Sequence, residues 1–530
     1  MIENFRDPLA EYRPVPFWSW NEKLNKKELL RQMRAMKQAG YGGFFMHSRV
    51  GLITRYLSDE WMDDVRFCAE RAGELGLEPN LYDEDMWPSG YAAGAVPAAG
   101  ADYREKALVL IDPAQKREDD EVVAVGAIKE KPYCICIRTA AVGNVRFAGQ
   151  SYIDIFNPNA IQLFFHTTHD KYAATVGDLF GSKLKYIFSD EACYGIHWFY
   201  DTPHVTYSPY LRGRFRKDNG YDILEKVHEL FFETGDYRKT RYDYFRAASA
   251  QFNDSYTKQY SEYARKRGLQ FTGHLMSEES CYEQVQWTGG VMPCYEYMSV
   301  PGVDKLSRVD EDQLVTIKQM TSVAEQLGKP RALSECFAGI GHESGFIGRK
   351  KIMDWQAVHG INYINMHLSH YSMRGERKRD YPPNIFYQQP YFAEEKSFSD
   401  YAARLSTVAA FGKRETRVLV LSPLYSVFAE YNPNGKENEK RLRAAYDTPF
   451  AALNALLEKS RIEWHIGDET ILSRHAAVNG KLFEVGCCRY DTVVLPPVSN
   501  ISSETAKLLG AFSRNGGRLF AIGEMPSYID

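Results

Sequence analysis

The chain has no apolar run long enough to cross a bilayer, and its N-terminus, Met-Ile-Glu-Asn-Phe-Arg-Asp, lacks the basic, then apolar, pattern of a signal peptide. Its 65 Lys and Arg nearly balance 69 Asp and Glu. The resulting net charge of −4 gives no attraction for nucleic acid or for an anionic membrane. These absences predict a cytoplasmic protein that binds neither nucleic acid nor membrane.

Cysteine shows no disulfide or metal pattern. The nine residues are an odd number, and the close pairs Cys134/Cys136 and Cys487/Cys488 lack the two-residue gap of zinc and redox motifs. We therefore expect reduced thiols. What the sequence does contain is 44% hydrophobic, 25% charged and 14% aromatic residues over 530 positions. This length predicts two or three domains, and the aromatic content fits sugar recognition and core packing equally well.

Short apolar segments alternate with amphipathic helical patterns over residues 1–415. This alternation is typical of β/α units around a parallel sheet. Helices are expected from Lys26 to Gln38 and from Asp310 to Leu327, with glycine stops. Eight strand candidates predict a (β/α)8 TIM barrel: Val15–Trp20, Tyr41–His47, Leu77–Tyr82, Leu184–Ser189, Leu269–His274, Val291–Tyr297, Ala332–Cys336 and Ile361–His367.

Three segments depart from this rhythm. Residues 105–157 contain three short strand patterns, which predict a β insertion after the third barrel strand. Residues 204–266 are polar and rich in tyrosine, and we expect two helices there. After Gly412 the alternation restarts, which predicts a smaller doubly wound α/β domain over 416–530. Because the chain ends directly after a strand pattern, a longer protein is left open.

The segment Leu81-Tyr-Asp-Glu-Asp-Met-Trp-Pro-Ser-Gly90 follows the third strand candidate. It therefore places three carboxylates, a tyrosine and a tryptophan where a buried strand opens into a loop. Carboxylates accept hydrogen bonds from hydroxyl groups, and an indole ring covers the C–H face of a sugar. Alone, the segment fits a polyhydroxylated ring and, equally, an acidic loop with a tryptophan plug.

Similar side chains recur at other strand ends, where a barrel of this kind places its active site. We predict a substrate site from Trp18, Trp20, His47, Arg49, Tyr82, Asp83, Asp85, Trp87, Asp190, His274, Glu278, Tyr295, Glu296, His367, His370 and Tyr371. Structural roles are equally good interpretations for single members, such as a satisfied core histidine for His274 and an ordinary ion pair for Arg49.

Hydrolysis of a glycosidic bond needs one carboxyl group to protonate the leaving oxygen and a second to act on water or on the anomeric carbon. Glu191 follows the apolar fourth strand, whose partly dry surroundings would raise its pKa. Glu335 follows the seventh strand, on roughly the opposite side of a barrel. We predict Glu191 as the acid and Glu335 as its partner, with a helix cap or an ion pair as the alternative role.

No cofactor is predicted to be required. A dense acidic site leaves Ca²⁺ open, with Asp83, Asp85, Asp190 or Glu278 as oxygen ligands. The sequence contains neither EF-hand spacing nor a His-Glu-x-x-His string that would support a specific metal.

The chain resembles the α-L-rhamnosidases of glycoside hydrolase family 106 and their uncharacterised relatives over roughly residues 14–390. The resemblance is carried by Pro16-Phe-Trp-Ser-Trp-Asn21, Gly42-Gly-Phe-Phe-Met-His-Ser-Arg-Val-Gly-Leu52, Tyr56-Leu-Ser-Asp-Glu-Trp61, Tyr82-Asp-Glu-Asp-Met-Trp-Pro-Ser-Gly90, Gly273-His-Leu-Met276, Leu333-Ser-Glu335 and Arg377-Lys-Arg-Asp-Tyr-Pro-Pro383. It implies a catalytic barrel, a doubly wound second domain, β-sandwich domains beyond, an inverting pair of glutamates and calcium at the sugar.

By this resemblance Glu191 is the acid and Glu335 the base, with Glu278 as an alternative base or a ligand. The string Ser189-Asp-Glu-Ala-Cys-Tyr194 differs from the Asp-Ser-x-Glu form of typical members, which bears on rhamnose specificity. We therefore predict a glycoside hydrolase that removes a terminal sugar, rhamnose or related, from small oligosaccharides or glycosides. A non-catalytic carbohydrate-binding or sensing protein and a metal-dependent sugar-acid isomerase or lyase stay open, as does a homo-oligomer.

Overall fold

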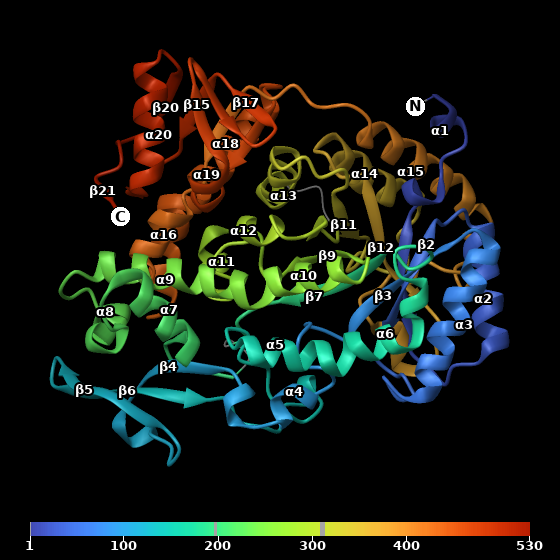
Figure 1. Cartoon of the computed structure of the whole chain (residues 1–530), viewed down its shortest axis with the longest axis horizontal. Coiled ribbons are helices and arrows are strands. Elements are labelled where there is room, and N and C mark those ends of the chain that lie inside the picture. Colours follow the sequence, from blue (N-terminus) through green and yellow to red (C-terminus); the bar gives the residue numbers. More distant parts are fainter. Residues whose placement is uncertain (1, 196–198, 308–312) are drawn as a thin grey trace.

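A closed barrel of eight parallel strands forms the centre of the molecule (Figure 1). The computed structural model describes residues 2–195, 199–307 and 313–530. The barrel closes in the order β1-β12-β11-β10-β9-β7-β3-β2, which confirms the predicted TIM barrel. Its strands are β1 (Val15–Trp20), β2 (Gly43–Ser48), β3 (Glu78–Asp85), β7 (Tyr186–Ala192), β9 (Gln270–Leu275), β10 (Val300–Asp304), β11 (Leu333–Cys336) and β12 (Tyr363–His370).

Successive side chains on each strand point alternately into the barrel and out toward the helices. The inward side chains fill the barrel, so a substrate can be reached only by residues at the strand ends. The interior is packed by Val15, Phe17, Phe45, Tyr82, Tyr186, Phe188, Val300, Leu333, Tyr363 and Leu368. On β1 the neighbouring residues Trp18 and Trp20 face outward. The Trp20 ring lies 4.8 Å from the ring of Trp61, and Trp18 Nε1 donates to Gln32 at 2.8 Å.

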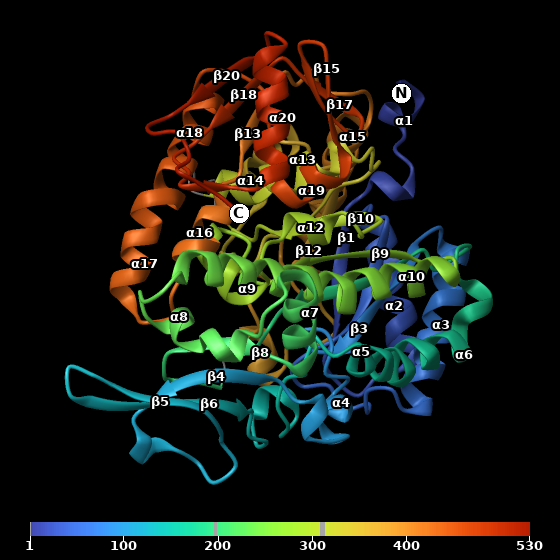
Figure 2. The same cartoon turned by 60° about the vertical axis from the view of Figure 1, so that its left-hand side comes forward.

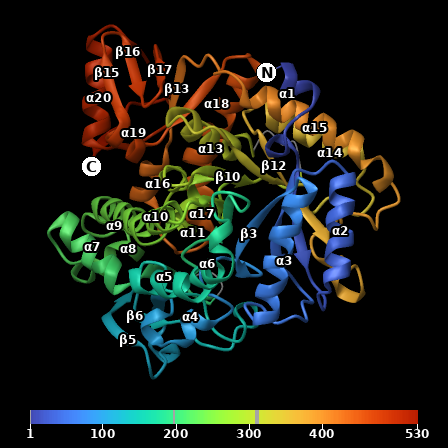
Figure 3. The ribbon, with the colours of Figure 1, turned by 45° about the vertical axis from the view of Figure 1, so that its right-hand side comes forward.

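Helices form the layer outside the barrel, and α2 and α3 are seen beside its strands in Figure 3. Asn25 caps α2, and α3 starts at the cap Ser58 and stops at Gly76 in the left-handed conformation. No helix in the described ranges is long and apolar enough to cross a membrane. The main helices of this layer are α2 (Lys26–Gln38), α3 (Asp59–Leu75), α5 (Pro158–Phe164), α6 (Asp170–Val176), α9 (Tyr237–Phe252), α10 (Lys258–Lys266), α11 (Cys281–Trp287), α13 (Leu314–Gln326), α14 (Phe346–Val358) and α15 (Glu395–Ala410).

The predicted sixth strand is wrong. Its segment contains the short helix α12 (Met292–Tyr295), and the sixth strand is β10, which follows it. Pro301 and Gly302 conceal β10 in the sequence, because both residue types are rare inside strands. A side chain at Gly302 would not fit, since its Cβ would lie 2.6 Å from the carbonyl oxygen of Gly273 on the neighbouring strand.

The predicted β insertion is an antiparallel sheet of four strands in the order β5-β6-β4-β8. Three strands come from the predicted segment: β4 (Lys106–Ile111), β5 (Glu121–Ile128) and β6 (Lys131–Thr139). The fourth, β8 (His204–Tyr207), lies in the segment predicted to be helical, and four residues are too few to give a periodic signal. Helices α7 (Pro209–Asn219) and α8 (Val227–Phe231) follow it. Figure 2 shows β4, β5 and β6 at the opposite end of the molecule from the C-terminal region.

The C-terminal region is the predicted open α/β unit. Its parallel sheet has the order β14-β13-β18-β20. The strands are β13 (Val418–Leu421), β14 (Trp464–Gly467), β18 (Thr492–Leu495) and β20 (Arg518–Ala521). Around them lie α16 (Leu424–Glu430), α17 (Lys436–Leu442), α18 (Thr448–Lys459), α19 (Glu469–His475) and α20 (Ser503–Arg514), together with the antiparallel strands β15 (Ala476–Asn479), β16 (Leu482–Val485) and β17 (Cys488–Tyr490).

We propose a domain boundary near residue 415, between α15 and β13. Helix α13 of the barrel is buried along its whole length except at Glu325, and the C-terminal region supplies part of that cover. Lys318 Nζ lies 2.7 Å from Glu463 Oε1, and Glu325 Oε2 lies 3.1 Å from His465 Nε2.

A chain shortened to end at residue 415 is therefore expected to fold but to melt at a lower temperature, because α13 loses the partners of its buried polar groups. Calorimetry of the two chains measures the difference. Equal melting temperatures would show that the C-terminal region contributes nothing to the stability of the barrel.

Candidate active site

Two consecutive carboxylates, Asp190 and Glu191, reach the same mouth of the barrel at the end of β7. A regular strand would turn successive side chains to opposite faces. Here the pairing of β7 with β9 shifts register between Ser189 and Ala192, and Glu191 has a φ of 51°, in the left-handed region. This bulge re-aims the side chains, so that both carboxyl groups approach His274.

His274 lies between carboxylates from two other strands. Its Nε2 is 2.9 Å from Asp190 Oδ1, and its Nδ1 is 3.7 Å from Glu335 Oε2. The preceding Gly273 allows this approach: with a φ of 144° it carries no Cβ, which would lie 1.9 Å from the carbonyl oxygen of Ser189. Burial opposes a charge on His274, but the hydrogen bond and charge of Asp190 and the charge of Glu335 raise its pKa well above the ordinary value. The flanking carboxylates therefore favour the charged form of the ring.

Two overlapping groups of three side chains converge at this mouth. The first group is Asp190, His274 and Glu335, and the second is Glu191, His274 and Asp304. Within each group, a carboxylate oxygen or ring nitrogen of every member lies within 4.8 Å of those of the other two. Asp304 ends β10 and stands opposite Glu335 in the strand register. Glu191 and Glu335, predicted from the fourth and seventh strand ends, therefore both adjoin His274.

Burial sets the proton affinity of these groups. It raises the pKa of Glu191 well above its ordinary value, and the charges of Asp190 and Asp304 add to the effect. The pKa of Glu335 is raised in the same way, by burial and then by Asp304. Asp304 itself is raised to about 7, again chiefly by burial. Burial acts against ionisation of Asp190 too, but the hydrogen bond and charge of His274 lower its pKa overall. The mouth thus combines one ion pair, Asp190 with His274, with three carboxyl groups whose pKa values are raised mainly by burial.

Side chains from β2, β3 and a distant loop fix one wall. Arg49 makes a two-pronged ion pair with Asp380, with Nε–Oδ2 at 2.8 Å and Nη2–Oδ1 at 2.5 Å. The ring of His47 stacks on Tyr82 at 3.6 Å between centroids, and the Tyr82 hydroxyl donates to Asp190. These contacts hold the Asp190 carboxylate in one orientation.

Several buried polar atoms near the mouth have no hydrogen-bond partner within the described ranges. They include Nδ1 of His367, both ring nitrogens of His370, Oδ1 of Asp304 and Oε2 of Glu335. His367 Nε2 lies 3.8 Å from Glu335 Oε1. Buried polar groups are normally paired, so these atoms indicate a site that a polar ligand or water completes.

The four residues considered as possible calcium ligands already have protein partners, and Asp190 pairs with His274 at the mouth. Asp83 accepts from Ser89 at 2.5 Å and from Tyr260 at 2.9 Å, Asp85 accepts from Ser48, and Glu278 accepts from Tyr295 at 2.5 Å and from the Asp304 amide at 3.0 Å. Calcium takes about six to eight oxygen ligands. Among the described residues, each of the two sets of possible metal ligands at the mouth includes His274, and both ring nitrogens of His274 face carboxylates. These residues do not fit a calcium site.

Other predicted members lie away from the cluster. Trp18 and Trp20 do not face the mouth, because the alternation of β1 turns both indoles outward into the helix layer. Glu296 pairs with Arg474 and His475 of the C-terminal region, at 2.7 and 2.9 Å.

Two further members hold neighbouring elements in place. Trp87 lies beneath the Arg146 guanidinium, 4.8 Å from its ring centroid. Tyr371 is bonded through its backbone to Ser19 and Gln32. Two residues of the mouth were not among the predicted site residues: Asp304, because β10 was not recognised, and Asp380, whose partner Arg49 lies 331 positions earlier in the chain.

Comparison with known proteins supports the fold. No family model matches the chain, and no curated protein matches it. Among solved structures, it is similar to a rhamnosidase from Novosphingobium sp. PP1Y, with a TM-score of 0.69 and 13% identity over 99% of this chain and 70% of that one. A β-galactosidase from Rahnella sp. R3 gives a TM-score of 0.57 at 13% identity, over 97% and 72% of the two chains.

An exo-carrageenase from Bacteroides ovatus gives a TM-score of 0.51 at 11% identity, over 98% of this chain and 66% of that chain. At such low identities the similarity shows the fold alone. The chain has a TIM-barrel fold like that of glycoside hydrolases, with the β insertion and the C-terminal α/β region described above.

Proposed function

We propose that the chain is a glycoside hydrolase that removes a terminal sugar by a two-carboxyl, inverting mechanism. The observation that carries the proposal is the position of Glu191 and Glu335: both adjoin His274 at the C-terminal mouth of the barrel, where burial favours a proton on Glu191 and the charge of His274 acts against one on Glu335. Hydrolysis of a glycosidic bond needs one carboxyl group that holds a proton and one that accepts a proton from water.

In the proposed reaction the Glu191 carboxyl donates its proton to the glycosidic oxygen. The bond from that oxygen to the anomeric carbon breaks, and the oxygen keeps the electron pair. Glu335, as a carboxylate, accepts a proton from the water molecule that attacks the anomeric carbon from the other face. The His274 imidazolium favours the ionised form of Glu335 through its charge and holds the carboxylate of Asp190.

Rhamnose or a related sugar is the proposed substrate. Support comes from the sequence strings around the strand ends and from the fold similarity to a rhamnosidase. The unpartnered atoms of Asp304, Glu335, His367 and His370 would accept or donate hydrogen bonds to ring hydroxyls.

A screen of aryl glycosides of the common deoxy and neutral sugars tests this proposal. We expect hydrolysis of an α-L-rhamnoside or a close relative, and proton NMR of the first-formed sugar should show the inverted anomer. Absence of hydrolysis across the panel by a folded protein would refute the glycosidase assignment. A product of retained configuration would make Glu335 a nucleophile instead of a base.

A metal-dependent enzyme acting on sugar acids is the second candidate, favoured by the two groups of carboxylate and histidine at the mouth. Against it, His274 must be neutral to ligate a metal, and the flanking carboxylates favour its protonated form. Metal analysis of the purified protein separates the candidates: a stoichiometric transition metal would favour the second.

A further inference from the structure

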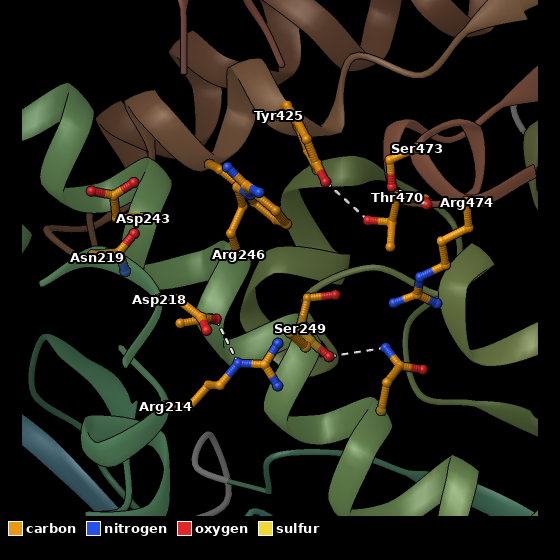
Figure 4. Close-up of a pocket in the computed structure, with 14 residues that line it drawn as sticks. Arg214, Asp218, Asn219, Asp243, Arg246, Ser249, Tyr425, Thr470, Ser473 and Arg474 are labelled. Atoms are coloured by element: carbon orange, nitrogen blue, oxygen red, sulfur yellow. Dashed lines mark hydrogen bonds and ion pairs between the residues drawn. The ribbon is translucent and has the colours of Figure 1, made fainter. Parts of the chain in front are cut away.

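A polar cavity of about 370 Å³ lies between the barrel helices and the C-terminal region (Figure 4). Helices α7 and α9 line it from the barrel side, and α16 and α19 line it from the other. It shares no lining residue with the carboxylate cluster around His274. Its volume falls within the range of about 300–1,000 Å³ that is typical of small-molecule sites, which often lie at domain interfaces.

Three arginines from three different helices line this cavity: Arg214 from α7, Arg246 from α9 and Arg474 from α19. Figure 4 shows Arg214 and Arg474 reaching toward the space from different sides. Arg214 is held by Asp218 at 2.5 Å and by Asp254 at 2.7 Å. Arg474 is held through one nitrogen, Nη1, by Glu296 at 2.7 Å. These ion pairs fix the two side chains while leaving other N–H groups of each guanidinium for a ligand.

Arg246 differs from the other two arginines. Its guanidinium lies over the rings of Tyr242 and Tyr425, at 5.1 and 5.9 Å from their centroids. Nη1 donates to the Tyr242 hydroxyl at 3.3 Å and lies 3.8 Å from a carboxylate oxygen of Asp530. The two rings fix the orientation of the guanidinium group. Among the described residues, only that carboxylate, at 3.8 Å, lies within ion-pair distance to balance its positive charge.

The acidic residues of the lining are already engaged, and hydroxyl groups complete the wall. Asp218 is bound to Arg214, whereas Asp243 accepts from Lys239 at 2.5 Å and from Tyr221 at 3.0 Å. The hydroxyl groups of the lining belong to Ser249, Tyr425, Thr470 and Ser473, and that of Tyr425 lies 2.9 Å from Thr470 Oγ1. The cavity therefore offers guanidinium groups and hydroxyl groups to a ligand, and none of the described lining residues has a carboxylate without a partner.

We propose that this cavity binds a small hydroxylated anion, a sugar acid or a sugar phosphate, that bridges the barrel and the C-terminal region. Arginine forks match the geometry of carboxylate and phosphate oxygens, and the surrounding hydroxyl groups match those of a sugar. The proposal uses neither Glu191 nor Glu335, so it stands independently of the proposed hydrolysis.

Isothermal titration calorimetry with galacturonate, glucose 6-phosphate, inorganic phosphate and neutral galactose tests the site. We expect at least one sugar anion to bind the full chain more than tenfold more tightly than galactose. Binding of galacturonate alone identifies a sugar acid, whereas binding of glucose 6-phosphate and phosphate identifies a phosphate group. Failure of every anion to bind, or equal binding of galactose, would overturn the proposal.

Two arginine variants with the same change in charge locate the binding. Arg246→Gln should weaken anion binding at least tenfold, whereas Arg265→Gln, on an exposed position of α10, should leave it unchanged. Equal affinity in both variants would refute the site. Glu335→Gln should bind the anion as the parent chain does, and loss of binding there would move the ligand to the barrel mouth. If Arg246→Gln does not fold, the comparison of anions with galactose and the Glu335→Gln result still decide.

Discussion

Glu191→Gln is expected to fold like the parent chain and to lose about 10²–10⁴-fold in kcat on glycosides with poor leaving groups. The amide cannot donate the proton that the departing oxygen requires. Activated aryl glycosides leave with little protonation, so their loss should be much smaller. Kinetics on a matched pair of alkyl and dinitrophenyl glycosides measures the contrast, and equal, mild losses on both would contradict the assignment.

The pH profile gives the same variant a second readout. An acid catalyst must hold its proton, so parent activity falls as the pH rises through the pKa of Glu191, which burial raises well above the ordinary value. A glutamine has no such proton to lose, and this alkaline limb should disappear in Glu191→Gln. Glu262→Gln, at an exposed position of α10, is the matched control and should keep both the rate and the limb.

Periodicity predicted the barrel because each β/α unit repeats the same local pattern, and each helix stop is encoded by a local cap such as Ser58 or Gly76. It failed at β10, where the strand needs Gly302 for close approach to β9 and carries Pro301 beside it. Gly302 is required there by the contact between β10 and β9, which are neighbours in space. The residue propensities of one segment carry no information about such a contact.

The site was predictable to the level of strand ends, which is why Glu191 and Glu335 were found. The direction of each side chain was not, because it depends on alternation and on bulges. The bulge at Glu191 brings two successive carboxylates together, whereas regular alternation turns Trp18 and Trp20 away. Asp380 pairs with Arg49, 331 positions earlier in the chain, and no local sequence pattern indicates such a pair.

Glu335→Gln is expected to lose about 10²–10⁴-fold in kcat on both classes of substrate. The attacking water must lose a proton whether or not the leaving group needs one, so an activated aryl group should not spare this variant. The change also removes the negative charge that lies 3.7 Å from His274 Nδ1, so the pKa of His274 should fall toward its ordinary value. NMR titration of the histidine ring measures that change, and thermal melting checks that the fold is kept.

The two glutamate variants together assign the roles, because their losses should depend differently on the leaving group. If Glu335→Gln spares activated substrates and Glu191→Gln does not, the acid and the base are exchanged. If both variants keep activity within a few-fold on every substrate, neither carboxyl is catalytic. In that case Asp304, which stands opposite Glu335 in the register and has a pKa raised to about 7 by burial, becomes the residue to replace next. Glu191, Asp304 and Glu335 can each carry a proton beside His274. The group that donates its proton in the reaction is identified by how the rate of each variant depends on the leaving group.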